Sequence, residues 1–135
     1  MSLWGLNNIM ENFITLIHEF LDQKVSKEIW YQDIKDHLKA IILYGSVAKG
    51  TNRPDSDIDL LLILPLAVEE KYTSGEYFLN HQGQEFNIVM RSIERLRDIA
   101  AGDHDSFQAE VFRNSKIIWQ KDDEVADLIN KIHGK

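Results

Sequence analysis

The chain has 135 residues, of which 44% are hydrophobic, so we expect a single domain over residues 1–135 with an ordinary buried core. Its formal net charge of −7 and isoelectric point near 5.1 argue against a general nucleic-acid-binding surface, but they leave room for one nucleotide bound through local cations or a metal. The sequence has no cysteine, which excludes disulfides and thiolate zinc sites and fits a cytoplasmic location, and it has no apolar stretch long enough to span a membrane.

The first part of the chain is predicted to be helical. Between residues 8 and 21, apolar side chains recur at helical spacing, at Ile9, Phe13, Leu16, Ile17, Phe20 and Leu21. This pattern predicts an amphipathic helix. Ser26 is of a residue type that often caps helices, and we expect it to begin a second helix that continues to Leu38.

Two short apolar segments follow, separated by a polar loop. The first covers residues 40–44 and stops at a Gly-Ser pair, and the second covers residues 57–64 and begins with two aspartates that alternate with apolar residues. The loop between them contains Gly, Asn and Pro, which favour turns. The pattern predicts two buried strands joined by a turn, which would bring Ser46, Asp57 and Asp59 to one end of a sheet.

Asp57 and Asp59 are the leading candidates for a ligand site. Residues two apart on a strand point to the same face, roughly 6.5 Å apart along the chain. Two carboxylates held at the margin of an apolar strand repel each other and lose hydration, and a hard cation such as Mg²⁺ relieves both costs. Gly45 and Ser46 suit the binding of phosphate, because glycine allows close backbone approach and free N–H groups at a turn or helix start attract anions.

Two other interpretations of this acidic stretch compete with a magnesium site. Aspartates in loops often cap helices or lie solvated, and Asp55 fits that role. A calcium-binding loop would use Asp55, Asp57 and Asp59 as its first, third and fifth positions. Such a loop needs glycine next and an acid at its twelfth position, where this chain has Leu60 and Leu66, so calcium is rejected.

The rest of the chain alternates strands and helices. The predicted elements are strands at residues 76–80, 84–90 and 116–119 and helices at 93–100, 107–112 and 125–132. Ser92 is expected to cap the first of these helices, and Asp122 or Asp123 the last. The alternation, together with a predicted strand–turn–strand unit, indicates an α/β (α+β) fold in which helices pack on a mixed β-sheet.

The motif residues together carry a family resemblance. Gly45-Ser46, ten further residues and then Asp57-x-Asp59 form a spaced pattern within LYGSVAKGTNRPDSDIDLLLI. The pattern resembles the DNA polymerase beta-like nucleotidyltransferase superfamily, specifically its minimal nucleotidyltransferases, over a motif core at about residues 40–90. The resemblance implies the nucleotidyltransferase fold.

The resemblance also implies roles for the motif residues. Asp57 and Asp59 are expected to hold Mg²⁺ against the triphosphate of ATP or another nucleotide, with Gly45 and Ser46 on the β and γ phosphates. Lys49 and Arg53 lie in the intervening loop and are candidates to add positive charge at the nucleotide, with a solvated surface role as the alternative.

A third carboxylate is usual in the family, on a later strand between apolar residues. In this chain Asn87 stands in that frame, and Glu85 lies two residues earlier on the same predicted face. Asparagine offers a metal a carbonyl oxygen but supplies neither a base nor negative charge. We therefore expect Asn87 to be a metal ligand and Glu85 to be the substitute catalytic acid.

The implied reaction moves a nucleoside monophosphate, AMP from ATP, to a hydroxyl acceptor. The family includes small antitoxins that modify a tyrosine of a HEPN-type ribonuclease toxin, and this chain offers little room for a separate acceptor-binding domain. A protein partner of that type is therefore expected. The alternative from the same residues is a catalytically degenerate, nucleotide-binding antitoxin or scaffold module.

Overall fold

The computed structural model describes residues 3–53, 55–72, 76–102 and 106–133, in two compact units divided after residue 35. The first unit contains α1 (Leu3–Gln23), a 3₁₀-helix (Val25–Lys27) and α2 (Ile29–Ile34). The predicted first helix is thus confirmed and is longer at both ends.

The predicted cap at Ser26 is wrong. Ser26 lies inside the 3₁₀-helix, and its hydroxyl donates to the backbone carbonyl of Asp22. The cap position of α2 is Glu28, which makes no side-chain capping bond, and α2 ends at Ile34, where a 3₁₀-helix (Lys35–His37) follows. A serine hydroxyl that donates to the carbonyl oxygen four residues earlier stabilises the preceding helix, and it is then not available to cap the next one.

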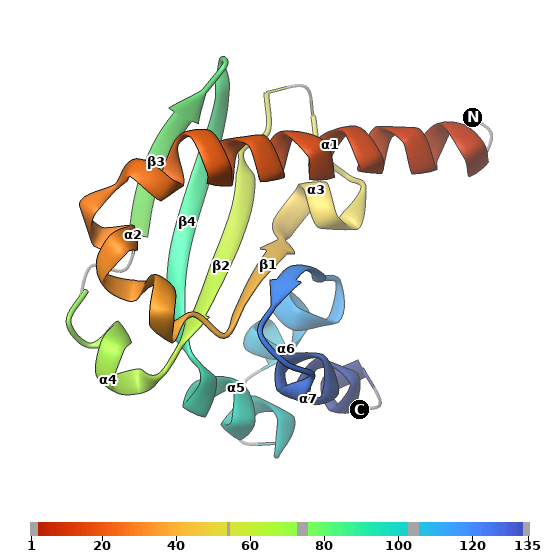
Figure 1. The fold of residues 1–135 in the computed structure, drawn as a ribbon. Helices are drawn as coiled ribbons and strands as arrows, with labels where there is room; N and C mark the ends of the chain where they lie inside the picture. The colour runs from red at the N-terminus through yellow and green to blue at the C-terminus, as the bar shows by residue number, and fades with distance from the viewer. Residues whose placement is uncertain (1–2, 54, 73–75, 103–105, 134–135) are drawn as a thin grey trace. The chain divides into compact units, whose positions relative to one another are not determined.

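The second unit is built on one mixed five-stranded sheet, as the sequence predicted. Its strands are β1 (Ala40–Tyr44), β2 (Ile58–Leu64), β3 (Glu76–His81), β4 (Gln84–Ser92) and β5 (Lys116–Gln120). The order is β3-β4-β2-β1-β5, and β2–β4 is the one parallel pair in it. Figure 1 shows β3 and β4 as a long hairpin that brings β4 back beside β2.

Short helices and turns connect these strands. α3 (Gly45–Lys49) follows β1 directly, and α4 (Leu66–Glu69) follows β2. The predicted turn between β3 and β4 is confirmed: its central residues, Gln82 and Gly83, have φ angles of 54° and 82°. Two consecutive positive φ angles are typical of a tight hairpin turn whose twist matches that of the strands.

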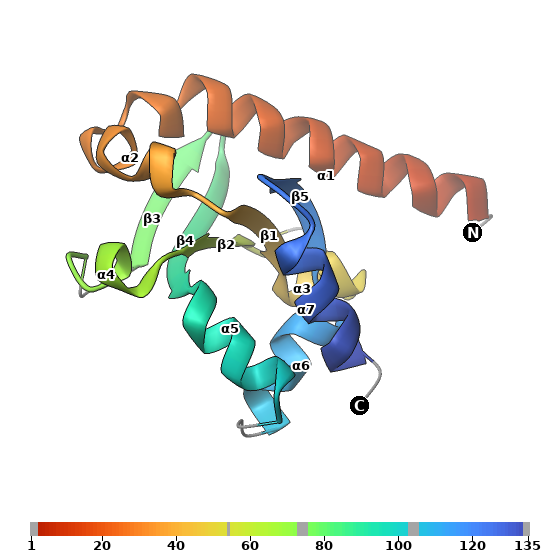
Figure 2. The same cartoon turned by 60° about the horizontal axis from the view of Figure 1, so that its bottom comes forward.

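Three helices cover one face of the sheet: α5 (Ile93–Ala100), α6 (Ser106–Arg113) and α7 (Glu124–His133) (Figure 2). Their apolar sides pack on strand residues of that face to form a core, and burying such side chains is the main stabilising contribution in a domain of this kind. The core residues that the strands contribute are Ala40, Ile42, Leu61, Ile63 and Val89. None of the described helices is both long and apolar enough to cross a membrane.

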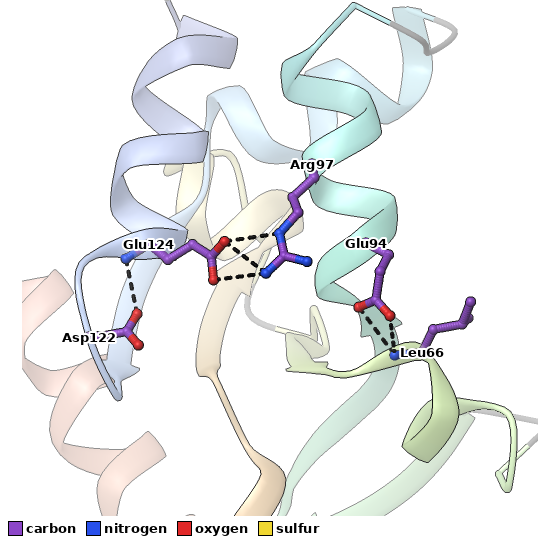
Figure 3. Close-up of polar contacts among 5 residues, drawn as sticks. All are labelled: Leu66, Glu94, Arg97, Asp122 and Glu124. Carbon is purple, nitrogen blue, oxygen red and sulfur yellow. Dashed lines mark hydrogen bonds and ion pairs between the residues drawn. The ribbon is translucent and has the colours of Figure 1, made fainter.

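Polar contacts fix the ends of these helices. The predicted cap at Ser92 is confirmed, because its Oγ atom accepts from Arg95 N at 3.0 Å. Figure 3 shows the contact at the start of α7, where Asp122 Oδ1 accepts from the first helical N–H, that of Glu124, at 3.0 Å. Arg97 on α5 donates twice to Glu124 on α7, at 2.9 and 3.1 Å. Both side chains are partly exposed, so this ion pair contributes about 1 kcal/mol at most to the stability of the fold. It joins α5 to α7.

Candidate functional site

Four neighbouring strands each contribute one residue to a row across the sheet. Asp59 on β2 pairs in register with Tyr44 on β1 and with Asn87 on β4, and Asn87 pairs with Phe78 on the edge strand β3. Register partners share a face of a sheet. Residues two places further along, such as Leu61, belong to the core under the helices. The row therefore lies on the helix-covered face of the sheet.

The two aspartates lie at the start of β2 in different environments. Asp57 is exposed and immediately precedes the strand, whereas Asp59 is half-buried within it. Burial raises the pKa of Asp59, a hydrogen bond with the Asn87 side chain lowers it, and the nearby charge of Asp57 raises it further. The site therefore holds two carboxylates close together, and only that of Asp59 is partly shielded from water.

Gly45 lies directly against Asp59. Its φ angle is +77°, a conformation that other residues rarely adopt. A Cβ atom at this position would collide with Asp59 Oδ2 and would lie 3.2 Å from the Cγ atom. The first turn of α3 thus begins beside the carboxylate, and this close approach explains why glycine must precede Ser46.

One of the two candidate cations, Lys49, is the last residue of α3 and not a loop residue as the sequence predicted, whereas Arg53 lies in the loop from α3 to β2. Lys49 and Arg53 are both exposed. The loop folds back by local bonds: Thr51 N donates to Ser46 O at 3.0 Å, and Arg53 N donates to Ser56 Oγ at 2.8 Å. These bonds fix the backbone of the loop. They do not test whether Lys49 and Arg53 contact a nucleotide, so both roles stay predictions.

Glu85 and Asn87 both lie on β4, two residues apart, but have different neighbours. The exposed Glu85 accepts a hydrogen bond from Asn80 Nδ2 on β3 at 2.9 Å, at the turn end of the hairpin. Asn87 pairs with Asp59 instead, and its Oδ1 atom is buried without a hydrogen-bond partner among the described residues. Of the two, Asn87 holds the position beside the candidate metal ligand.

The available donors fit a hard divalent cation. They are the carboxylates of Asp57 and Asp59 and the unpartnered carbonyl oxygen of Asn87. Mg²⁺ favours oxygen ligands and is usually held by one or two carboxylates together with substrate phosphates. Across the described ranges, no three His, Cys, Asp or Glu side chains gather into a metal-binding group.

A cavity of about 320 Å³ adjoins the row between the sheet and the helices. Tyr44 and Asn87 line it, as do Leu61 and Val89 from the sheet. Its remaining lining residues come from the end of β4, from α5 and from α6; among them are Arg91, Arg95, Gln108 and Phe112. Sequence reasoning missed this cavity, because α5 and α6 meet over the sheet through tertiary packing that no local pattern reports.

Comparison with known proteins gives a family match. The model of a family described as "Polymerase beta, Nucleotidyltransferase" matches residues 14–124. No match was found among curated protein sequences.

Solved structures give a fold match. A nucleotidyltransferase-like protein from Exiguobacterium sibiricum 255-15 superposes with a TM-score of 0.53 at 13% identity, over 76% of this chain and 36% of that one. The chain therefore spans about a third of the length of that protein. A toxin-antitoxin with AMP-PNP gives a TM-score of 0.43 at 18% identity, over 78% of this chain and 79% of that one. A mutant of the toxin-antitoxin MntA-HpeT gives 0.42 at 15% identity, with the same coverage of 78% and 79%.

Proposed function

The chain belongs to the polymerase beta nucleotidyltransferase family, and from that premise we propose that it transfers AMP from ATP to a hydroxyl acceptor with the help of Mg²⁺. One observation carries the proposal: Asp59, with Asp57 close by, lies against Gly45 at the start of α3. The carboxylates that can bind a metal therefore lie beside the backbone at Gly45, where the absence of a side chain lets a phosphate come close.

Each motif residue has a role in this proposal. Gly45 and Ser46 bind the β and γ phosphates, and positive charge is added by Lys49 at the end of α3 and by Arg53 in the loop that follows. Asp57, Asp59 and Asn87 hold Mg²⁺, which when bound neutralises phosphate charge and orients the triphosphate. The protein's contribution is to position the acceptor hydroxyl in line with the leaving pyrophosphate and to supply charge that is already organised.

We further propose that the acceptor is a protein hydroxyl, a tyrosine of a HEPN-type toxin partner, and that the reaction takes place in the cytoplasm. The resemblance of the motif around Asp57 and Asp59 to minimal nucleotidyltransferases, which include such antitoxins, supports the first proposal, and a sequence without cysteine is consistent with the second. The test is incubation of the purified protein with labelled ATP, Mg²⁺ and candidate partners, followed by intact mass measurement. A partner that gains the mass of one AMP is the expected result. Label transferred only to a free small molecule would contradict the protein acceptor.

Glu85 is proposed as the catalytic acid or base, and Glu85→Gln is expected to lower transfer by at least about 10²-fold while nucleotide binding is kept. Its carboxylate lies on the same face as Asn87, and its bond to Asn80 is exposed and can exchange. Asn80→Ala is the control for the hairpin, because it removes the bond to Glu85 and the bond that Asn80 Oδ1 accepts from Gly83 N, and it leaves the carboxylate. Pyrophosphate release measures both variants. Equal losses in the two variants would assign Glu85 to the hairpin instead of the reaction.

A second function, nucleotide binding without efficient transfer, is favoured by one observation. Asn87 occupies the position beside Asp59 and has an amide where the family usually has a carboxylate. If this amide limits turnover, Asn87→Asp should raise pyrophosphate release about tenfold, the equivalent of about 1.4 kcal/mol in the barrier. The same change should lower the melting temperature in EDTA, because a third carboxylate adds repulsion. A variant slower than wild type would contradict the idea that the amide limits turnover.

A further inference from the structure

The cavity beside Asp59 has no role in the function proposed above. Two of its lining residues, Tyr44 and Asn87, are the register partners of Asp59 on either side, so the cavity begins where the candidate metal ligand lies. We propose that this cavity binds the heteroaromatic base of the nucleotide. The inference rests on the proposed function, because it assumes that the phosphates bind at Gly45 and Asp59.

The cavity walls have the chemistry of a site for a flat, partly polar ring. Leu61 and Val89 form an apolar floor on the sheet, and helix residues such as Phe112 form an apolar wall. A planar ring can bury its faces between such surfaces while its edges keep hydrogen bonds. The volume of about 320 Å³ lies at the lower end of the range for small-molecule sites, which suits a base better than a segment of a protein.

Polar groups at the cavity are placed to contact the edges of such a ring. Arg95 on α5 donates to Gln108 Oε1 on α6, which joins the two helices across the cavity lining. Asn87 lines the cavity at its Asp59 side, where the proposed function gives its Oδ1 atom to the metal, so the edge of the ring is left to the groups on β4, α5 and α6. Arg91 adds a second guanidinium, and guanidinium groups both stack on nucleobases and donate to them. Two cations at one cavity of an acidic chain favour a nucleotide over a purely apolar ligand.

The geometry of in-line transfer keeps the acceptor out of this cavity, so the cavity is available to the base. In-line transfer requires the acceptor to approach the α phosphate from the side opposite the pyrophosphate. The pyrophosphate side is that of Gly45 and Ser46, at the end of β1. The opposite side of the row is the sheet edge at Phe78, whose side chain is 67% exposed. An acceptor can therefore approach over the edge strand without entering the cavity.

The test compares two probes, ATP and inorganic tripolyphosphate, each titrated with Mg²⁺ by calorimetry. Val111 lines the cavity from α6 and is only partly buried, so the larger side chain of Val111→Phe fills part of the cavity with little change at the surface. We expect this variant to bind ATP at least about tenfold more weakly and tripolyphosphate as well as wild type does. Val111→Ala, which enlarges the cavity, is the control and should keep ATP binding within about threefold.

Two outcomes would overturn the inference in different ways. ATP binding to a folded Val111→Phe protein that equals wild type would overturn the base site alone. Failure of wild type to bind either probe would overturn the proposed function and the base site with it. Methyl NMR of wild type keeps the test decisive if the variant does not fold. The signals of Leu61, Val89 and Leu96 should shift with ATP and not with tripolyphosphate, and identical shifts with both would reject the base site.

Discussion

Replacing Asp59 by asparagine is expected to reduce nucleotidyl transfer by at least about 10³-fold, because it removes one of the two carboxylates that hold the metal. Asparagine keeps the shape of the side chain, so the loss reports charge and not packing. Asp55→Asn is the matched control, since it removes a carboxylate from the exposed loop nearby and should keep transfer. Pyrophosphate release with a verified acceptor measures both. Transfer by Asp59→Asn within tenfold of wild type would contradict the assignment.

The same substitution is expected to stabilise the protein in EDTA at neutral pH. Burial raises the pKa of Asp59 in the folded state above its ordinary value, so the native state binds this proton more tightly than the unfolded chain does. Wild-type stability from this group therefore falls as the pH rises through the two pKa values and stays lower at neutral pH. The gain of Asp59→Asn in melting temperature should thus shrink in acid, below both pKa values. A variant less stable than wild type at pH 7 in EDTA would contradict this reasoning.

Gly45→Ala is expected to impair both folding stability and function. The positive φ angle alone costs on the order of 1–3 kcal/mol for a residue with a side chain. The added methyl group must also displace the Asp59 carboxylate, so transfer should fall by at least about tenfold.

Gly50→Ala separates these two effects. Gly50 has almost the same φ angle, +76°, but among the described residues no atom beyond its two chain neighbours lies within 4 Å of the Cβ position. This variant should lose similar stability in urea unfolding and keep most of its transfer activity. If Gly45→Ala and Gly50→Ala lost transfer equally, the contact between Gly45 and Asp59 would not be the cause.

The parts of the fold that local chemistry decides could be predicted from the sequence. Alternation with a period of two placed Asp59 at the start of a buried strand, and turn residues placed the hairpin at Gln82 and Gly83. Ser92 caps its helix by accepting from Arg95 N, and the cap persists although the same side chain also bonds the Glu69 side chain. At Ser26 the carbonyl of Asp22 lay within reach, and the local bond went to the earlier helix.

The parts that depend on distant pairing could not be predicted in the same way. The sequence placed Glu85 and Asn87 on one face of a strand but contained no measure of which one would lie beside Asp59. That choice follows from the parallel register of β2 and β4. The cavity depends in the same way on how α5 and α6 pack, and the contact between Arg95 and Gln108 joins helices that have no local relation.

The contact between Gly45 and Asp59 also limits how this site can change during evolution. A side chain at position 45 needs the space that the carboxylate at position 59 occupies, so a substitution of Gly45 is most harmful while Asp59 is kept. A relative with a bulkier residue at the first position should therefore carry a shorter one at the second. A change at one of these positions alone gives an impaired protein. Positions 45 and 59, although they lie on different elements, are therefore expected to change together.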